Sequence, residues 1–460
     1  MLKKRLHITL STLLCCFTAV GAYAQAVVTI PETSITTQAD YTATVSNGTS
    51  SSLGALGSIT IKSTTANFPA TTAGTSAPLA LGVVHPKVNS IGGANLLGSA
   101  SEVTLNQTAQ AIYSTVLGLG GGALTVNYRI AIAGTPWLAG TYTTPVTFTN
   151  VTPLTQDLSI VVPGLITLGT QVPSTTTMAV STLSAFRTGG GVSAPNVFDY
   201  FSTVPTDVYL KSTGSTFSFT TTQLFNSSPI VSSDKLSSLL SGTYAGPAIN
   251  LSTTNQAVST TTSVPVVVTN KNSHTNTLSI SAADLKANFP QAGIYTLPVV
   301  YTIAKKSTAY PATLTSGTMN SSVQLTVAKM SELTIPASTI NLSFTTAAAY
   351  NQGVTAVMSS PITVSSTVPY SVTVKTSGNF ISGANSIPAG VMIVEGIPTQ
   401  TGIAAVTLST TAQNLFTSAD PVIDRAINLQ FRIPNTQTVN LLNKPAGTYN
   451  ATVTFTIVAP

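Results

Sequence analysis

One strand pattern occurs three times in this chain, and its regular spacing constrains the fold more than any other feature. The copies begin at Gly140, Gly293 and Gly447, which lie 153 and 154 residues apart. In each copy an Ala-Gly pair precedes a tyrosine, after which apolar residues alternate with more polar ones, as in residues 449–457. Alternation with a period of two predicts a half-buried β-strand that follows a tight turn.

Two further segments repeat in the same order along the chain. Both lie upstream of this closing strand, and the copies are residues 59–62, 208–211 and 372–375, and residues 103–105, 249–251 and 406–408. Three segments in one order in three copies predict an internal repeat of whole domains.

Composition supports strands as the main element. Charged residues make up only 7% of the chain, hydrophobic residues make up 43%, and Ser and Thr fill more than a quarter of the positions. β-Branched Thr and Val suit a pleated, half-buried surface. We therefore expect an all-β chain of three tandem β-sandwich domains, over residues 26–163, 164–329 and 330–460, joined by short linkers into a semi-rigid rod.

The N-terminus has the three parts of a secretory signal. Basic residues 3–5 precede an apolar run over 8–21, and Ala-Tyr-Ala at 22–24 supplies small residues for cleavage. The run is shorter than the roughly 20 apolar residues that a membrane span needs. We expect a cleaved signal peptide at residues 1–24, an exported protein and no later membrane span.

Removal of that signal would change both the charge and the thiol content of the chain. Cys15 and Cys16 lie inside it, so the mature chain would have no disulfide, and Leu14 before Cys15 argues against a lipoprotein. The mature chain would carry 15 basic and 12 acidic residues, with no basic stripe. Such a balance excludes nucleic acid as a partner on electrostatic grounds.

The third copy differs from the others after its closing strand. The first domain continues with an apolar segment at 158–162 and the second with one at 323–327, whereas the third reaches residue 460 three positions after Ile457. One expectation is that the third domain does without this strand. The alternative is an open sheet edge that accepts a strand from another subunit.

Several motifs resemble sites of chemistry, and each has a simpler interpretation. Residues 118–123 match a dinucleotide-binding glycine pattern, but an alternating strand follows at 124–130, so we expect a glycine-rich hairpin or loop. His85 and His274 lie in different domains without cysteines, which argues against zinc, and we expect both at the surface. Residues 191–195 lack the last glycine of a serine-nucleophile elbow.

The acidic residues and the single tryptophan leave two further alternatives open. Asp420 and Asp424 could bind calcium, but a capped turn or a solvated loop is expected instead. Trp137 could be a sugar-stacking platform, although we expect it to fill the core near a turn. We predict no catalytic, cofactor-binding or metal-binding residues, and no cofactor.

The closing strand has the form Ala-Gly-Thr-Tyr-x-x-x-Val-Thr-Phe-Thr at residues 139–149 and 446–456. It resembles the C-terminal strand of pilin and spore-coat-U-like domains, and the chain as a whole resembles bacterial exported surface and fimbrial-type proteins. This resemblance implies Ig-like β-sandwiches. Pilins that assemble through a chaperone and usher are usually single domains, often with a disulfide, and this chain departs on both counts.

These observations favour a non-enzymatic structural or adhesive cell-surface protein, a rod that contributes to a filament, coat or cell contact. The alternative is a secreted carbohydrate-binding or accessory module of a polysaccharide-handling system. The expected partners are protein subunits of a surface assembly or a host or cell-surface polymer, and homo-association through sheet edges stays open. The expected location is extracellular or at the cell surface, with the periplasm as the alternative.

Overall fold

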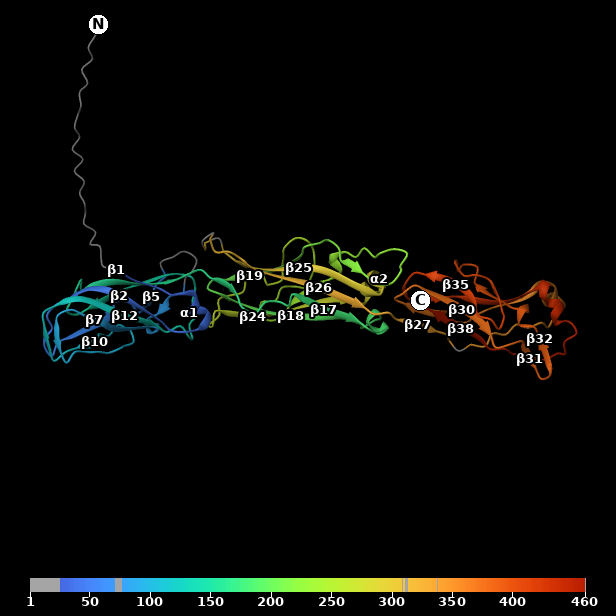
Figure 1. Ribbon diagram of the computed structural model, residues 1–460, viewed down its shortest axis with the longest axis horizontal. Helices are drawn as coiled ribbons and strands as arrows, with labels where there is room; N and C mark the ends of the chain where they lie inside the picture. Colours follow the sequence, from blue (N-terminus) through green and yellow to red (C-terminus); the bar gives the residue numbers. More distant parts are fainter. Residues whose placement is uncertain (1–24, 71–76, 308, 311–312, 337, 460) are drawn as a thin grey trace, which may run out of the picture.

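The computed structural model describes residues 25–70, 77–307, 309–310, 313–336 and 338–459. The all-β fold class is confirmed, because strands form most of the regular structure and pair into sheets of two to six strands. Figure 1 shows three Ig-like β-sandwich domains arranged end to end as an extended rod. The expected signal peptide lies outside the described residues.

The first domain packs two main sheets face to face and carries a smaller sheet at one end. The six-stranded sheet has the order β1 (Gln25–Thr29), β15 (Thr155–Val162), β13 (Gly140–Phe148), β4 (Ser58–Ser63), β10 (Gln110–Ser114), β9 (Ser99–Ala100). The facing sheet has the order β14 (Val151–Thr152), β2 (Tyr41–Ser50), β12 (Gly122–Ile130), β7 (Val84–Ile91). The remaining elements are α1 (Glu32–Thr37), η1 (Leu81–Val83), the pair β5 (Asn67–Phe68) and β6 (Leu79–Ala80), and the small sheet β3 (Gly54–Ala55), β11 (Leu117–Leu119), β8 (Ala94–Leu96).

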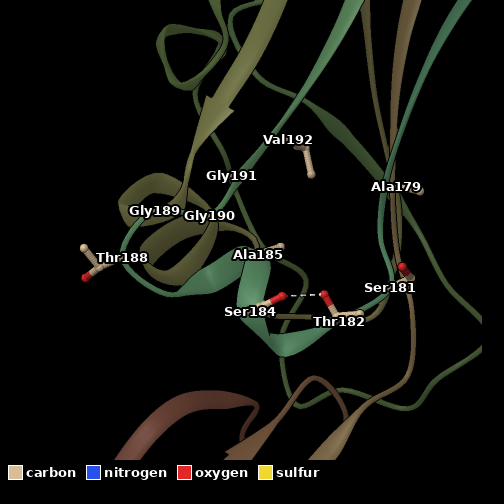
Figure 2. A pocket seen from close by; sticks show the side chains of 10 residues that line it. All are labelled: Ala179, Ser181, Thr182, Ser184, Ala185, Thr188, Gly189, Gly190, Gly191 and Val192. Carbon is tan, nitrogen blue, oxygen red and sulfur yellow. Dashed lines mark hydrogen bonds between the residues drawn. The ribbon is translucent and has the colours of Figure 1, made fainter.

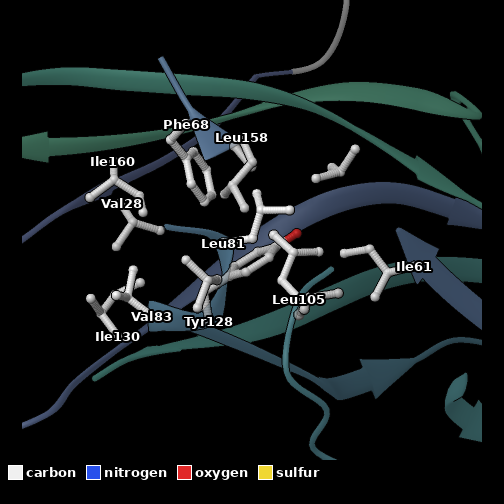
Figure 3. Close-up of a cluster of buried hydrophobic side chains, with 14 of the residues drawn as sticks. Val28, Ile61, Phe68, Leu81, Val83, Leu105, Tyr128, Ile130, Leu158 and Ile160 are labelled. Carbon is white, nitrogen blue, oxygen red and sulfur yellow. The ribbon is translucent and has the colours of Figure 1, made fainter. Parts of the chain in front are cut away.

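Alternate side chains from both main sheets fill the core of the first domain. Figure 3 shows Leu158 and Ile61 from one sheet and Tyr128 from the other among the buried side chains. The buried Tyr128 hydroxyl accepts a hydrogen bond of 2.9 Å from the Nδ2 of Asn47. Burial of this apolar surface drives folding, and the hydrogen bond removes the cost of burying the hydroxyl.

The second domain has the same two-layer design with longer strands. Its six-stranded sheet has the order β17 (Thr175–Val180), β26 (Gly317–Val327), β25 (Gly293–Lys305), β19 (Thr206–Ser212), β23 (Gln256–Ala257), with β20 (Ser218–Thr220) also on β25. The facing sheet has the order β16 (Ile166–Leu168), β18 (Gly191–Ser202), β24 (Lys271–Ser281), β21 (Ser237–Leu240), β22 (Ile249–Asn250). The helical elements are η2 (Leu183–Phe186), η3 (Ser233–Lys235) and α2 (Ala282–Asn288).

The third domain is divided into smaller sheets. One sheet has the order β27 (Ser331–Thr334), β29 (Ile362–Ser366), β36 (Val422–Ile427), and a second has the order β28 (Gly353–Val357), β37 (Leu429–Pro434), β33 (Ile393–Gly396), β34 (Val406–Thr407). A third has the order β35 (Gln413–Ala419), β30 (Tyr370–Thr376), β38 (Val453–Val458). The strands β31 (Phe380–Ser382) and β32 (Asn385–Ile387) form a separate pair. The helical elements are α3 (Ala347–Gln352), η4 (Ala389–Val391) and η5 (Asn435–Leu441).

The repeated sequence segments occupy equivalent places in all three domains. The closing strand pairs with the Lys-containing upstream strand in each, as β13 with β4, β25 with β19 and β38 with β30. A third strand then pairs with the other edge of that upstream strand, as β10, β23 and β35. This three-stranded unit gives a common frame in which the domains can be compared.

One buried threonine clamps the first domain to the second. Thr203 Oγ1 donates to the carbonyl of Pro163 at 2.7 Å and accepts from the backbone N–H of Leu165 at 2.8 Å. The carbonyl of Thr203 accepts from the N–H of Ala139, just before β13, at 2.8 Å. The linker and the closing strand of one domain are therefore both bonded to a turn of the next.

Thr367 repeats the clamp between the second and third domains. Its Oγ1 donates to the carbonyl of Ala328 and accepts from the N–H of Met330, both at 2.8 Å. Its carbonyl accepts from the N–H of Ala292, just before β25, at 2.7 Å. Both threonines lie in a Ser-Thr-Val-Pro sequence, at residues 202–205 and 366–369.

Around this shared clamp the two joints differ in chemistry. At the first joint Val204 packs with Ala139 and Tyr310 in a small apolar cluster. At the second, Asp424 of the third domain accepts from Arg187 Nη2 at 3.1 Å and from Lys286 Nζ at 3.0 Å, both from the second domain. Together with the short linkers, these contacts support the extended arrangement in Figure 1.

Candidate functional site

The outer edge of β38 is the feature that distinguishes the third domain. In the first domain β13 is followed outward by β15 and β1, and in the second β25 is followed by β26 and β17. In the third, β38 is the last strand of its sheet, and within the described part of the chain its outer edge pairs with no strand. An edge of unpaired backbone groups is a template for another strand.

Side chains on β38 are less buried than their counterparts. Val146 of β13 and Val299 of β25 are 0% and 1% exposed, whereas the equivalent Val453 is only half-buried. Ile457 is also half-buried, while its counterpart Ile303 is 0% exposed. The core-facing row of β38 therefore lacks the cover that the neighbouring strand provides in the other two domains.

The segment just before the first helical turn of each sandwich shows the same contrast. In the first two domains it precedes a short helix, and β1 and β17 run parallel to β15 and β26. The corresponding residues 340–344 precede α3 but form no regular strand. Their apolar side chains, Ile340, Leu342 and Phe344, are half-buried against the core, whereas Val28 of β1 is fully buried.

A tyrosine two residues after the repeat glycine supports this alignment of the domains. The hydroxyls of Tyr142, Tyr295 and Tyr449 each donate to the carbonyl of the residue four positions earlier, at 2.8, 3.0 and 2.9 Å. Tyr142 and Tyr295 are 2% and 0% exposed, but Tyr449 is half-buried. The same turn therefore forms in all three domains, and only the burial of its tyrosine differs.

The first two domains define what kind of strand fits the open edge. β15 runs antiparallel to the closing strand β13 and parallel to β1. β26 likewise runs antiparallel to β25 and parallel to β17. Tyr142 faces Ile160 across the pair, and Tyr295 faces Leu325, and all four side chains are buried. A strand at the edge of β38 would therefore need apolar residues at alternate positions.

Trp137 is excluded as a sugar-stacking platform. It is 0% exposed, and its Nε1 donates to the carbonyl of Ile132 at 2.9 Å. Its backbone carbonyl accepts from the Nδ2 of Asn270 in the second domain, also at 2.9 Å. The expected place in the core near a turn is confirmed, and the residue supports the first joint.

The histidines differ from one another, and the surface expectation for His274 was wrong. His274 is 8% exposed and lies between the rings of Phe198 and Tyr200, with centroids 5.5 and 5.6 Å away. Burial lowers the pKa of His274, so the ring is neutral at pH 7. The buried residues in the first half of β24 are polar, as are the exposed ones. The alternation of apolar and polar residues therefore does not show that His274 lies on the buried face of this strand. His85 is half-buried on β7.

The acidic pair and the glycine-rich segment have structural roles. Asp424 is an anchor of the second joint, and Asp420 accepts from Asn226 Nδ2 at 2.7 Å. Partial burial acts to raise the pKa of Asp424, but hydrogen bonds from Lys286, Ser365 and Arg187 outweigh it and hold that pKa below its ordinary value. Residues 118–123 span the end of β11, a connection at residues 120–121 and the start of β12. Because β11 and β12 belong to different sheets, the segment is a glycine-rich loop, one of the two expected alternatives, and not a hairpin.

A shallow pocket beside the second joint is lined only by Ala, Ser, Thr, Gly and Val residues, so it contains no titratable side chain. Figure 2 shows that its lining comes from the end of β17, from η2 and from the glycine-rich loop before β18. Ser184 and Thr182 share a hydrogen bond of 2.8 Å there. Among the described residues no three His, Cys, Asp or Glu side chains are placed to hold a metal ion, and no helix is long and apolar enough to cross a membrane.

No protein-family model and no curated protein matches this chain. Similar solved structures include a mutant of the CFA/I enterotoxigenic E. coli adhesin CfaE, at 12% identity and a TM-score of 0.28 over 66% of this chain and 97% of that one. A chain of the CsuC–CsuE chaperone–tip adhesion subunit complex of Acinetobacter baumannii matches at 13% identity and 0.28, over 64% and 99%. The CupB6 tip adhesin of Pseudomonas aeruginosa matches at 8% and 0.24, over 62% and 91%.

These neighbours are of the fimbrial type that the closing strand resembles. Their TM-scores are all below 0.5, so they assign no role to any residue of this chain. The contacts and exposures of the chain itself support the proposals below.

Proposed function

We propose that this protein is a non-enzymatic structural subunit of an exported surface assembly, and that its third domain accepts an extended strand from another protein. The observation that carries the proposal is the unpaired outer edge of β38 beside half-buried apolar side chains. A strand in this position would add main-chain hydrogen bonds and cover the core in one step. The buried Trp137 removes the observation that favoured a carbohydrate-binding module.

The first two domains also provide the probe for a test. A synthetic peptide with the sequence of residues 317–327, the strand β26, has the alternation that the open edge requires. We expect it to bind the full chain, as measured by fluorescence anisotropy, and to slow amide exchange in β38 and in residues 340–344. The same peptide with Asp in place of Val323 and Leu325 should not bind, because two charges would enter the core.

Two variants of the chain provide matched controls. Val453→Lys places a charge on the core-facing side of β38, whereas Thr454→Lys places it on the exposed side. We expect the first to abolish peptide binding and the second to leave it unchanged. If the amides at the outer edge of β38 are already protected in the full chain without peptide, another segment covers this edge and the proposal fails.

A further inference from the structure

The end of the rod opposite to the open edge carries an unusual apolar surface. In the first domain β3 follows β2, β8 follows β7 and β11 precedes β12, so these short strands meet where the long strands end. The other ends of β2 and β12, at Tyr41 and Ile130, lie close to the second domain, since Gln38 Nε2 donates to the carbonyl of Thr269 at 3.1 Å. The three-stranded sheet therefore forms the tip of the rod (Figure 1).

This tip exposes leucines that a folded domain would normally bury. Leu117 lies opposite Ala55 on one side and Leu96 on the other, so the three form one row across a single face of the sheet. Leu119, two positions on, lies on the same face. Leu96 and Leu119 are 62% and 57% exposed, and all residues of the row face solvent. We call this row, with Leu56 and Leu97 in the adjoining turns, the leucine cap.

The two turn leucines adopt a backbone conformation that disfavours leucine. Leu56 has φ = 56° and Leu97 has φ = 51°, both in the left-handed region, and the side chains are 82% and 77% exposed. Asn and Gly occupy this region at lower cost, because bulky side chains crowd the backbone there. Neither leucine gains burial in exchange. The two turns therefore hold both side chains in solvent at a cost in backbone strain.

Charge is absent from this end of the domain. The segments nearest the tip, residues 46–61, 88–101, 110–125 and 147–156, contain no Asp, Glu, Lys, Arg or His. A partner recognised here cannot be held by ion pairs. Among the described residues of this end there is also no basic or exposed aromatic side chain, and such side chains usually anchor a protein in the polar headgroup layer of a membrane.

We propose that the leucine cap binds an uncharged apolar surface, one that presents hydrocarbon groups at high density. Leucines that project from tight turns can all contact such a surface at once, and contact removes their apolar area from water. A second copy of the chain is less suitable, because the sheet edges β3 and β8 are only two and three residues long. This proposal concerns the opposite end of the rod and does not depend on strand acceptance by the third domain.

Adsorption to defined surfaces tests the proposal with the full chain. Methyl-terminated and hydroxyl-terminated alkanethiol monolayers on a quartz crystal microbalance differ only in the groups they present. We expect adsorption to the methyl surface at low protein concentration, little to the hydroxyl surface, and no loss when sodium chloride is raised from about 0.1 to 1 M, because apolar contact is not screened by salt.

The variant Leu56→Asn with Leu97→Asn removes the two most exposed leucines of the cap. Asn tolerates positive φ, so this variant should fold at least as stably as the natural chain. We expect its affinity for the methyl surface to fall by about tenfold or more. The matched control is Leu224→Asn with Ile230→Asn, because these side chains of the second domain are 93% and 89% exposed.

Each other outcome overturns the proposal. Equal adsorption by the cap variant and the natural chain, or an equal loss in the control, would mean that the cap does not hold the surface. Cap-dependent binding to phosphatidylcholine vesicles without adsorption to the methyl surface would identify a membrane as the partner. A dimer in sedimentation velocity that only the cap variant abolishes would identify a second copy.

Discussion

His274 illustrates how single residues in this chain take roles that alternation alone does not predict. Its ring lies between Phe198 and Tyr200, and within the described residues its Nε2 has no hydrogen-bond partner. A proton on this ring would place a charge in the core, which explains the lowered pKa. The residue therefore links the stability of the second domain to pH.

The sign of this linkage follows from the direction of the shift. The folded chain keeps His274 neutral below pH 6.5, whereas the unfolded chain takes up a proton there, so stability is complete above about pH 6.5 and falls as pH decreases. We expect His274→Phe to remove this loss, whose slope is at most about 1.4 kcal/mol per pH unit, as pH falls below about 6.5. Chemical denaturation at several pH values measures it. His85→Gln is measured beside it, because partial burial also lowers the pKa of His85 and the contribution of each histidine is then separated. An unchanged slope in His274→Phe would contradict the assignment.

At the scale of elements, the joints depend on a turn as much as on the linkers. Thr203 and Thr367 are both 0% exposed, and each hydroxyl satisfies one backbone donor and one backbone acceptor of the linker. The Ser-Thr-Val-Pro sequence that contains them occurs in both the second and the third domain. Its repetition is a sequence signal for the joints that lies outside the three repeated strand segments.

Removal of one clamp hydroxyl should loosen one joint. Thr367→Ala leaves the carbonyl of Ala328 and the N–H of Met330 without their partner, at a cost of about 1–3 kcal/mol if both stay buried. We expect broader distances between spin labels on the second and third domains, measured by double electron–electron resonance. Thr367→Ser keeps the hydroxyl and should retain the narrow distribution. Equal broadening in both variants would mean that side-chain volume, not hydrogen bonding, sets the joint.

On the scale of the whole molecule, the three domains form a rod whose two ends differ. The leucine cap lies at the tip of the first domain, and the open edge lies in the third. Such polarity suits a subunit that attaches through one end and contacts a surface with the other. Each domain has a main core of its own, and Ile423 and Phe201 pack at the joints with the core of the neighbouring domain. Opening of one domain therefore need not open the others completely.

The incomplete cover of the third domain has a measurable consequence. We expect amides of β38 to exchange with solvent about 100-fold faster or more than those of β13 and β25, since each loss of about 1.4 kcal/mol in opening free energy is a factor of ten. Hydrogen–deuterium exchange with mass spectrometry on the full chain resolves these strands. Similar protection in all three closing strands would show that half-burial does not weaken the third domain.

Residue patterns within single segments were enough to predict the all-β fold class and the closing strands beside which the candidate site lies. Alternation with a period of two places β13, β25 and β38 as half-buried strands, because neighbouring side chains of a strand point to opposite faces.

Only the tertiary structure decided which residues are covered. Val453 and Val299 occupy the same position of the repeat, six residues after its glycine, yet β26 covers Val299 and no strand in the described chain covers Val453. The exposure of Leu56 and Leu97, the burial of His274 and the clamps at Thr203 and Thr367 likewise depend on partners far along the chain. Burial depends on contacts between segments that are far apart in the sequence. The alternation of residues within one strand does not show which strand, if any, lies beside it.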